Sequence, residues 1–304
     1  MKIAIIGAGA MGSIYAASLA ETNETILIDK SADRINYINK TGIVLHTPDG
    51  HCTTSNVPAM LNGSINSTFD LVIIFVKSLY TYEAIIQNIN IFGNNTTVLT
   101  LQNGYGNHNE ILKALPHAHI LVGTTMHGGT LQKDGSILHA AIGITELGAL
   151  NKSDEDSALN TISLFNHCGI PSRYSNNIMK TVWRKLIINA GINGIAALLE
   201  CKNSFIAQNP DAIEISKSIV KEAVTVANHI GCNSIIEDTQ KEVIRTAKLT
   251  GANYASMLQD IMANRPTEVD FIYGAIADTA VSEGLEAPLC RAIQHLIKAK
   301  EALN

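Results

Sequence analysis

The chain has 304 residues, of which 46% are hydrophobic and 16% are charged, and its formal net charge at pH 7 is −5. This composition is typical of a compact folded protein, and the length favours two domains over one. The negative net charge offers no basic field to a polyanion, so we expect no nucleic-acid partner. No segment approaches the roughly 18 to 20 uninterrupted apolar residues of a membrane span, so we expect no membrane partner either.

Five cysteines are spread along the chain, and no two of them have the C-x-x-C spacing of a redox or metal-binding pair. An odd number of scattered cysteines is typical of free thiols in a reducing compartment. Because the first residues already predict a strand, we expect no signal peptide before the fold. The cysteine pattern favours a cytoplasmic location, and we expect no metal site. The cysteines are Cys52, Cys168, Cys201, Cys232 and Cys290.

The first structural signal is a glycine-rich segment that follows a short β-branched run. Gly7, Gly9 and Gly12 have the spacing G-x-G-x-x-G, and the apolar residues after them recur with a helical period. In such a strand, turn and helix, the first glycine permits the turn, the second lets the backbone approach a pyrophosphate, and the third lets helix and strand pack closely. The helix N-terminus attracts the phosphates. The predicted cofactor loop consists of Gly7, Ala8, Gly9, Ala10, Met11 and Gly12.

The end of the second predicted strand bears on the choice of cofactor. Asp29 closes the strand 24–29, and a carboxylate at this place usually accepts hydrogen bonds from the ribose hydroxyls of NAD and repels a 2′-phosphate. Lys30 follows at once and Arg34 lies one helical turn further on, and either cation could bind a 2′-phosphate. The residues themselves therefore leave NAD(H) and NADP(H) both open.

The first half of the chain continues as alternating strands and helical stretches. The strand signals are nearly continuous apolar runs, as expected for a parallel sheet that is buried on both faces by crossover helices. The segment 135–148 predicts an antiparallel hairpin near the sheet edge. We therefore predict an α/β fold with a Rossmann-type dinucleotide-binding domain at residues 1–176. Its further elements are predicted strands at 43–46, 70–76, 97–101, 119–122 and 172–174, and a helix at 154–168.

The second half of the chain has a helical pattern throughout. We predict an all-α substrate and catalytic domain at residues 177–304, and we expect the substrate to meet the nicotinamide in the cleft between the two domains. No internal repeat or low-complexity segment interrupts this pattern. The predicted helices lie at 178–200, 210–231, 236–249 and 267–283, with a last helix after Pro288.

Three loops after predicted strands of the first domain carry polar or glycine residues. Lys77 follows one strand at its carboxyl end, where ligands of open α/β sheets bind. Asn103, in the glycine-containing segment 102–106, can donate and accept hydrogen bonds at a carboxamide or a ribose. Gly129 is expected to let the chain pass close to the cofactor. A solvated lysine and an ordinary turn are the alternative interpretations of Lys77 and Asn103.

In the second domain, Lys185, Asn189 and Asn193 follow one another at four-residue spacing, so on a helix they lie along one face. A buried lysine costs several kcal/mol unless it is paired or neutralised, so three polar groups on an apolar helix indicate a binding site. The alternative is a solvated helix face. Glu268 and Asp270 lie in the first turn of a later predicted helix, where carboxylates also serve a merely structural role.

Together, the glycine loop 7–12 and the segments 102–104, 183–193 and 256–270 resemble the ketopantoate reductase (2-dehydropantoate 2-reductase) family. The resemblance spans nearly the whole chain. It implies an NADPH-dependent reduction of 2-dehydropantoate to D-pantoate, a step toward pantothenate and coenzyme A. On this pattern Lys185 is the general acid, and Glu268 is its partner near the substrate hydroxyl and the cofactor.

The resemblance also assigns contact positions. The implied partner is a small-molecule 2-keto acid; the oligomeric state stays open, with a homodimer as the candidate assembly. Substrate contacts fall on Asn103, Asn189, Asn193, Asn203 and Ser256. Beyond the glycine loop, the cofactor contacts that the resemblance implies fall on Lys77, Asn103, Gly129 and Glu268, and the end of the second strand adds Asp29 and Lys30.

One residue departs from the family pattern. Asp29 stands where a small residue followed by Arg is more usual, and relatives with an acid at this position resemble NAD-dependent D-2-hydroxyacid dehydrogenases of the mandelate type. Such a dehydrogenase is the second functional hypothesis, and a catalytically silent dinucleotide-sensing protein is a remote third. In either enzyme the ammonium of Lys185 would polarise the keto group and protonate the alkoxide, with burial lowering its pKa and Glu268 raising it.

Overall fold

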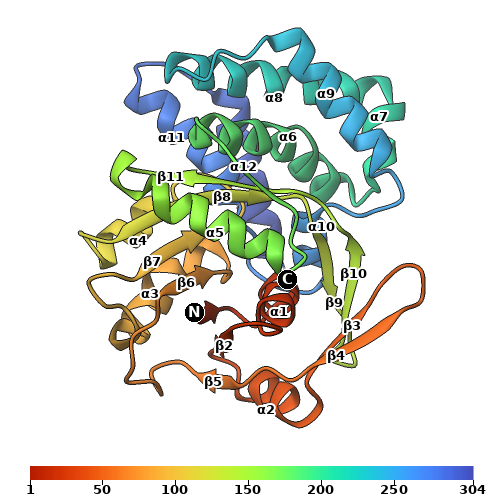
Figure 1. Cartoon of the computed structure of the whole chain (residues 1–304). Coiled ribbons are helices and arrows are strands. Elements are labelled where there is room, and N and C mark those ends of the chain that lie inside the picture. Colours follow the sequence, from red (N-terminus) through yellow and green to blue (C-terminus); the bar gives the residue numbers. More distant parts are fainter. Residues whose placement is uncertain (304) are drawn as a thin grey trace. The chain divides into compact units, whose positions relative to one another are not determined.

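The computed structural model describes residues 1–303, which form two compact units (Figure 1). The first unit comprises Met1–Gln102 and Asn107–Ile178 and contains strands and helices. The second comprises Asn103–Gly106 and the chain from Met179 onward, and all its regular elements are helical. The predicted fold class, a Rossmann-type α/β part followed by an all-α part, is confirmed.

The first unit is built on an eight-stranded sheet with the strand order β12-β11-β8-β7-β6-β1-β2-β5. All neighbouring strands are parallel except β11, which runs antiparallel to β8. The sheet consists of β1 (Lys2–Ile6), β2 (Glu24–Asp29), β5 (Ala59–Leu61), β6 (Leu71–Ile74), β7 (Thr97–Thr100), β8 (His119–Thr125), β11 (Thr145–Ala149) and β12 (Ser172–Tyr174).

The centre of this sheet is fully buried, which explains its continuous apolar strands. Residues 3–6 of β1 and all of β6 have no exposed surface or almost none. From β1 the chain passes to β2 on one side and later to β6 on the other, so the strand order reverses at β1. The carboxyl ends of β1, β2 and β6 therefore surround the crevice in which open α/β sheets bind their ligands.

A second sheet has the strand order β4-β3-β10-β9, and the helix α1 (Ala10–Leu19) packs against both sheets. The strands are β3 (Ile43–His46), β4 (Cys52–Ser55), β9 (Gly128–Leu131) and β10 (Ile137–Ala141). The remaining α-helices of the unit are α2 (Ala32–Thr41), α3 (Thr81–Gln87), α4 (Asn107–Ala114) and α5 (Glu155–His167).

Two predictions from the sequence are wrong here. The strand 43–46 exists but lies in the second sheet, where it pairs with β4 and β10. The segment 135–148 is not a hairpin, because β10 pairs with β9 and β11 pairs with β8 in the other sheet. The tight turn lies earlier, at Gly135 with φ +88°, and it folds β10 back onto β9. Strand periodicity is the same whichever partner a strand chooses, so the sequence pattern could not distinguish these pairings.

The second unit is a bundle of helices around α6 (Ile178–Leu199), which is apolar on nearly all sides. By length and composition α6 could cross a membrane, but 72% of its most apolar window is buried inside the protein, as in the core helix of a globular domain. The other helices are α7 (Asn203–Gln208), α8 (Pro210–His229), α9 (Ile236–Leu249), α10 (Ser256–Met262), α11 (Ala275–Ser282) and α12 (Pro288–Glu301).

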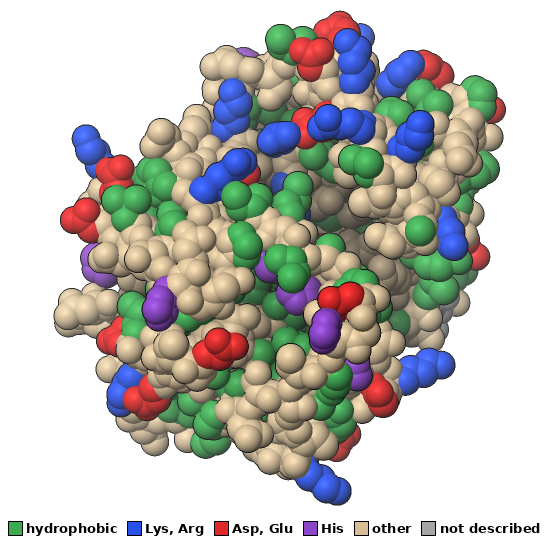
Figure 2. Space-filling view, turned by 45° about the vertical axis from the view of Figure 1, so that its right-hand side comes forward, with side chains coloured by type: hydrophobic (Ala, Val, Ile, Leu, Met, Phe, Trp, Pro, Cys, Tyr) green, Lys and Arg blue, Asp and Glu red, His purple; other side chains and the backbone are tan. Residues whose placement is uncertain are grey.

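The predicted helices of this unit are present, with two differences. The helix expected at 267–283 begins as a π-helical turn, η4 (Asp270–Gly274), and only then continues as α11. The short helices α7 and α10 were not predicted. On the face shown in Figure 2, Lys and Arg side chains gather over the helical unit with acidic side chains among them, while histidines lie over the sheet unit.

Candidate active site

The sheet unit contains a cavity of about 210 Å³ at the carboxyl ends of its central strands. Five residues predicted to bind the cofactor line this cavity together. It is lined by Gly7, Gly9, Asp29, Lys30, Asn62, Phe75, Val76, Lys77, Tyr80, Glu83, Ala84 and Gln87. The lining residues in and next to α3, such as Tyr80 and Glu83, were not predicted from the sequence. Their closeness to Lys77 along the chain was the signal that could have found them.

The glycine loop fits a dinucleotide at this place. Gly7 has φ +114°, and a Cβ there would lie 2.7 Å from the main chain of Phe75 at the end of β6. A Cβ on Gly9 would meet nothing within 4 Å, so the backbone borders open space that a ligand can enter. Gly9 is also the N-cap of α1, with no side chain capping the helix and no acid in its first turn. The positive end of α1 is therefore left for an anionic ligand such as a pyrophosphate.

Gly129 lies beside the same helix terminus. A Cβ at Gly129 would come within 2.6 Å of the Ile14 side chain and 3.3 Å of the Ala10 side chain. Strand β9 thus passes close over the first turns of α1, and a Cβ at Gly129 would displace the end of the Ile14 side chain. The close neighbour of Gly129 is therefore helix α1, and its contact with a cofactor stays a prediction.

Asp29 is oriented by the loop itself. Its Oδ2 accepts a hydrogen bond from the Ala8 amide at 2.7 Å, and its Oδ1 accepts one from the Ser31 amide at 2.9 Å. Each carboxylate oxygen keeps further acceptor capacity, which suits the hydroxyls of a ribose. The carboxylate is therefore held at the cavity wall.

The two cations that follow Asp29 in the chain, Lys30 and Arg34, differ in whether they face the cavity. The ammonium of Lys30 lies 4.0 Å from the centre of the Tyr80 ring, at the cavity. Arg34 instead donates from its guanidinium to the carbonyls of Ala8 (2.9 Å) and Gly135 (2.5 Å) and to the Ser13 hydroxyl (3.1 Å). Arg34 does not line the cavity, and it ties the glycine loop to the β9–β10 turn.

Gln102 links the ends of two neighbouring strands. From the end of β7 its side-chain amide donates to the Val76 carbonyl (2.7 Å) and to the Thr81 hydroxyl (2.8 Å). These bonds fix the segment that carries Lys77 after β6. Gln102 is thus a supporting residue, a role that depends on contacts more than 20 residues away in sequence.

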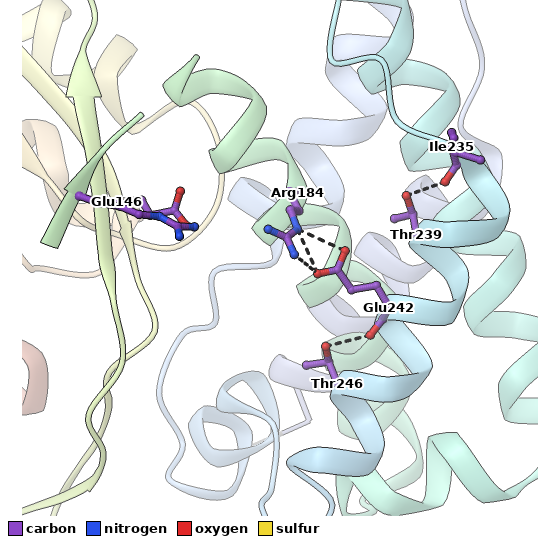
Figure 3. A network of polar contacts seen from close by, with 7 residues as sticks. Glu146, Arg184, Ile235, Thr239, Glu242 and Thr246 are labelled. Carbon is purple, nitrogen blue, oxygen red and sulfur yellow. Dashed lines mark hydrogen bonds and ion pairs between the residues drawn. The ribbon is translucent and has the colours of Figure 1, made fainter. Parts of the chain in front are cut away.

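In the helical unit, Lys185 lies on α6, on a different side of the helix from its neighbour Arg184. Figure 3 shows Arg184 turned toward Glu242 of α9, with which it forms an ion pair. Successive residues project about 100° apart on a helix, so Lys185 points elsewhere. Burial lowers the pKa of Lys185 to about 8, although the charge of Glu268 acts to raise it. The structure therefore brings Lys185 and Glu268 into electrostatic contact.

Asp270 has a structural role, unlike Glu268. Its carboxylate accepts a hydrogen bond from the Gln294 side chain at 2.6 Å and forms an ion pair with Lys298 at 3.0 Å, both on α12. These contacts account for its charge without a ligand. The helix-terminus interpretation therefore holds for Asp270, while the charge of Glu268 acts on Lys185.

The predicted substrate residues of the helical unit lie on three helices. Asn193 is buried on α6 and Asn189 is half-buried there, whereas Ser256 is exposed at the start of α10. Asn203 opens α7, and its amide Nδ2 donates to the Thr250 hydroxyl at 2.9 Å. The Oδ1 of Asn203 is buried and has no hydrogen-bond partner within residues 1–303, which leaves an acceptor for a ligand or a water.

The glycine loop at the carboxyl edge of the sheet, together with the similarity to known families, identifies an NAD(P)H-dependent oxidoreductase that reduces a keto acid. Residues 3–152 match the family described as "Ketopantoate reductase PanE/ApbA", and residues 177–301 match "Ketopantoate reductase PanE/ApbA C terminal". The chain belongs to the ketopantoate reductase family.

Its relatives include proteins that are named for two different activities. The 2-dehydropantoate 2-reductase of Pyrococcus horikoshii is 34% identical over 304 residues, and that of Streptococcus pyogenes serotype M1 is 31% identical over 305 residues; each comparison covers 100% of this chain and 99% of the relative. Among solved structures, D-mandelate dehydrogenase with NADH and anilino(oxo)acetate is 29% identical, with a TM-score of 0.93 over 100% of this chain and 99% of that one.

Proposed function

We propose that this protein reduces 2-dehydropantoate to D-pantoate, as a step in the biosynthesis of pantothenate and coenzyme A, with NADH as the electron donor. The observation that carries the proposal is Lys185, whose pKa of about 8 keeps its ammonium both protonated and acidic enough to give up a proton near neutral pH. The curated relatives that are 31% to 34% identical over the whole chain support 2-dehydropantoate as the substrate.

The chemistry needs two partners at the keto group. A bound nicotinamide supplies a hydride to the carbonyl carbon, and the protein must supply a proton to the oxygen. The Lys185 ammonium is the donor: it polarises the carbonyl, stabilises the developing alkoxide and then protonates it. Glu268 keeps that ammonium charged against the effect of burial.

The remaining polar residues of the helical unit bind the substrate in this proposal. Asn189 and Asn193 extend from Lys185 along α6, and Asn203, Ser256 and Asn103 add neutral donors and acceptors. Amides and a hydroxyl can donate to the substrate carboxylate without a fixed positive charge that would compete with Lys185. In this proposal residues 1–176 hold the cofactor, and residues 177–304 together with Asn103 hold the substrate.

Three features of the cavity support NADH over NADPH. Asp29 presents a carboxylate at the end of β2, a second carboxylate, that of Glu83, lines the same cavity, and Arg34 is bonded to the glycine loop. Two negative charges near the ribose would repel a 2′-phosphate. Lys30 remains as a cation at the cavity, over the Tyr80 ring.

A second candidate activity is the NAD-dependent interconversion of an aromatic 2-keto acid and its D-2-hydroxy acid. Asp29 favours it, and so does the close structural likeness to a D-mandelate dehydrogenase with NADH. The same Lys185 chemistry serves both substrates, because only the side chain next to the keto acid differs. A dinucleotide sensor without activity would have no use for a desolvated lysine paired with a glutamate.

One assay separates these functions. Oxidation of NADH and of NADPH is followed at 340 nm with ketopantoate, 2-ketoisovalerate and phenylglyoxylate as substrates. We expect the highest kcat/KM with NADH and ketopantoate. A higher value with phenylglyoxylate would establish the mandelate-type activity, and binding of the dinucleotide without turnover of any keto acid would contradict the enzyme proposal. Light scattering on the same sample tests the predicted homodimer.

A further inference from the structure

The loop Asn103–Gly106 leaves strand β7 of the sheet unit but packs as part of the helical unit. Two of its residues, Gly104 and Tyr105, contact the two segments that carry Lys185 and Glu268. We propose that the dipeptide Gly104–Tyr105 is a positioning element that sets Glu268 against Lys185. This inference rests on the proposed catalytic pair and adds a third segment to it.

The first contact is with the π-helical turn η4. The Tyr105 amide donates to the Phe271 carbonyl at 2.8 Å. Gly104 lies so close to the same peptide that a Cβ on it would be 2.5 Å from the Phe271 oxygen and 2.7 Å from the Phe271 Cβ. The dipeptide is thus pressed directly onto Phe271, and only glycine permits this approach.

Phe271 is in turn bonded to Glu268. The amides of Phe271 and Ile272 both donate to the Glu268 carbonyl at 3.0 Å. These bonds close the turn that begins at Glu268, so a shift of Phe271 moves the backbone of Glu268. A π-helical turn in an otherwise α-helical segment is often found at functional sites, where it aims a side chain.

The second contact is with α6. The Tyr105 ring lies 5.1 Å from the Trp183 ring, centre to centre and tilted by 52°. Trp183 is completely buried and stands two residues before Lys185. One residue, Tyr105, therefore holds η4 by its backbone and α6 by its ring.

A separate link joins the same two segments further along. The Tyr273 hydroxyl donates to the Ala190 carbonyl and accepts a hydrogen bond from the Gly194 amide at 2.8 Å. Tyr105 joins η4 to α6 at Trp183, before Lys185 in the sequence, and Tyr273 joins them at Ala190, after Lys185. Displacing the first link should separate Glu268 from Lys185 while the second still holds the fold.

The test compares alanine at two glycines of the loop. Gly104 has φ +88° and Gly106 has φ +98°, so alanine strains the backbone at both. Only at Gly104 would the new Cβ meet Phe271, because a Cβ on Gly106 would meet nothing within 4 Å. The pair Gly104→Ala and Gly106→Ala therefore isolates the contact with η4 from the effect of backbone strain.

The main readout is the pKa of Lys185 in each variant, measured by its rate of acetylation across pH with mass spectrometry. We expect Gly104→Ala to lower this pKa by roughly half a unit or more, because the charge of Glu268 moves away, and Gly106→Ala to leave it unchanged. Tyr105→Leu, which loses the ring contact with Trp183, should also lower it, whereas Tyr105→Phe should not. These variants serve as well if Gly104→Ala does not fold.

Equal pKa values of Lys185 in the wild type and in all folded variants would overturn the proposal. The measurement needs no turnover, so it stays informative if the proposed enzyme activity fails. Where turnover is present, kcat should fall about tenfold in Gly104→Ala, and the alkaline limb of the pH profile of kcat should move to lower pH. The Kd for NADH should be unchanged. A loss of kcat in Gly104→Ala with an unmoved pH limb would also contradict the positioning role.

Discussion

The guanidinium of Arg34 donates to the main-chain carbonyl of Ala8 at 2.9 Å, across the glycine loop. From its sequence position Arg34 was one of two cations that could bind a 2′-phosphate. Its bonds to Ala8, Ser13 and Gly135 engage all three nitrogens of the guanidinium, and burial lowers its pKa. The guanidinium of Arg34 is thus directed into the protein.

Arg34→Gln should therefore act on the fold of the loop. We expect a loss of about 2 kcal/mol in the free energy of unfolding, because charge-assisted hydrogen bonds to two carbonyls are lost. NADH and NADPH should lose affinity by the same factor, as measured by fluorescence titration. A loss that falls on NADPH alone would show that Arg34 binds the 2′-phosphate.

Asp29→Ala should change the cofactor preference. Without the carboxylate, the ribose hydroxyls of NADH lose an acceptor and the 2′-phosphate of NADPH loses a repulsive charge, so Lys30 can pair with that phosphate. We expect the ratio of kcat/KM for the two cofactors to move about tenfold or more toward NADPH, equivalent to roughly 1.4 kcal/mol.

The matched control is Asp33→Asn, which removes one negative charge from an exposed position in the first turn of α2. It should leave the ratio nearly unchanged. If the wild type already prefers NADPH strongly and Asp29→Ala does not alter the ratio, the NADH proposal is wrong.

Elements that bury a regular apolar pattern could be predicted from the sequence. Strand β1 is an example that is buried on both faces. Helix α9 has a strong amphipathic pattern, and its predicted bounds, 236–249, coincide with those observed. The family resemblance was confirmed by the matches over both halves of the chain. The roles of Lys185, Glu268 and the substrate residues stay predictions, as does the boundary at residues 176 and 177.

Features that depend on distant partners could not be predicted. The role of Arg34 depends on Gly135, 101 residues away, and the partner of strand β10 depends on a turn outside its own pattern. The π-helical turn that begins at Asp270 also has a distant partner. The Phe271 carbonyl in this turn accepts a hydrogen bond from the Tyr105 amide, more than 160 residues earlier in the chain. Local periodicity carries no record of such contacts.

Lys185→Ala should lower kcat by about 100-fold or more, because the keto oxygen loses its proton donor. The Kd for NADH should change little, as the cofactor loop lies on other elements. Lys180→Ala serves as the control, since it removes an exposed lysine from the same helix. Single-turnover and steady-state assays distinguish chemistry from product release. Retention of more than about a third of the wild-type kcat would remove Lys185 from the mechanism.

Glu268→Gln keeps the shape of the side chain and removes its charge. The reaction needs the Lys185 ammonium, whose pKa is about 8, so kcat should fall as the pH rises through about 8 in the wild type. Because Glu268 raises this pKa, the variant should lose its proton at lower pH, and the alkaline limb of the profile should move down. At pH values well below the limb the two enzymes should differ least.

The control for this experiment is Asp270→Asn, two residues along the same segment. Asp270 pairs with Lys298 and Gln294, so its loss should weaken the fold slightly and leave the limb in place. The pH profile of kcat is measured with saturating NADH and keto acid for all three proteins. If Glu268→Gln and Asp270→Asn give the same limb as the wild type with full activity, Glu268 is only a carboxylate near the start of a helix.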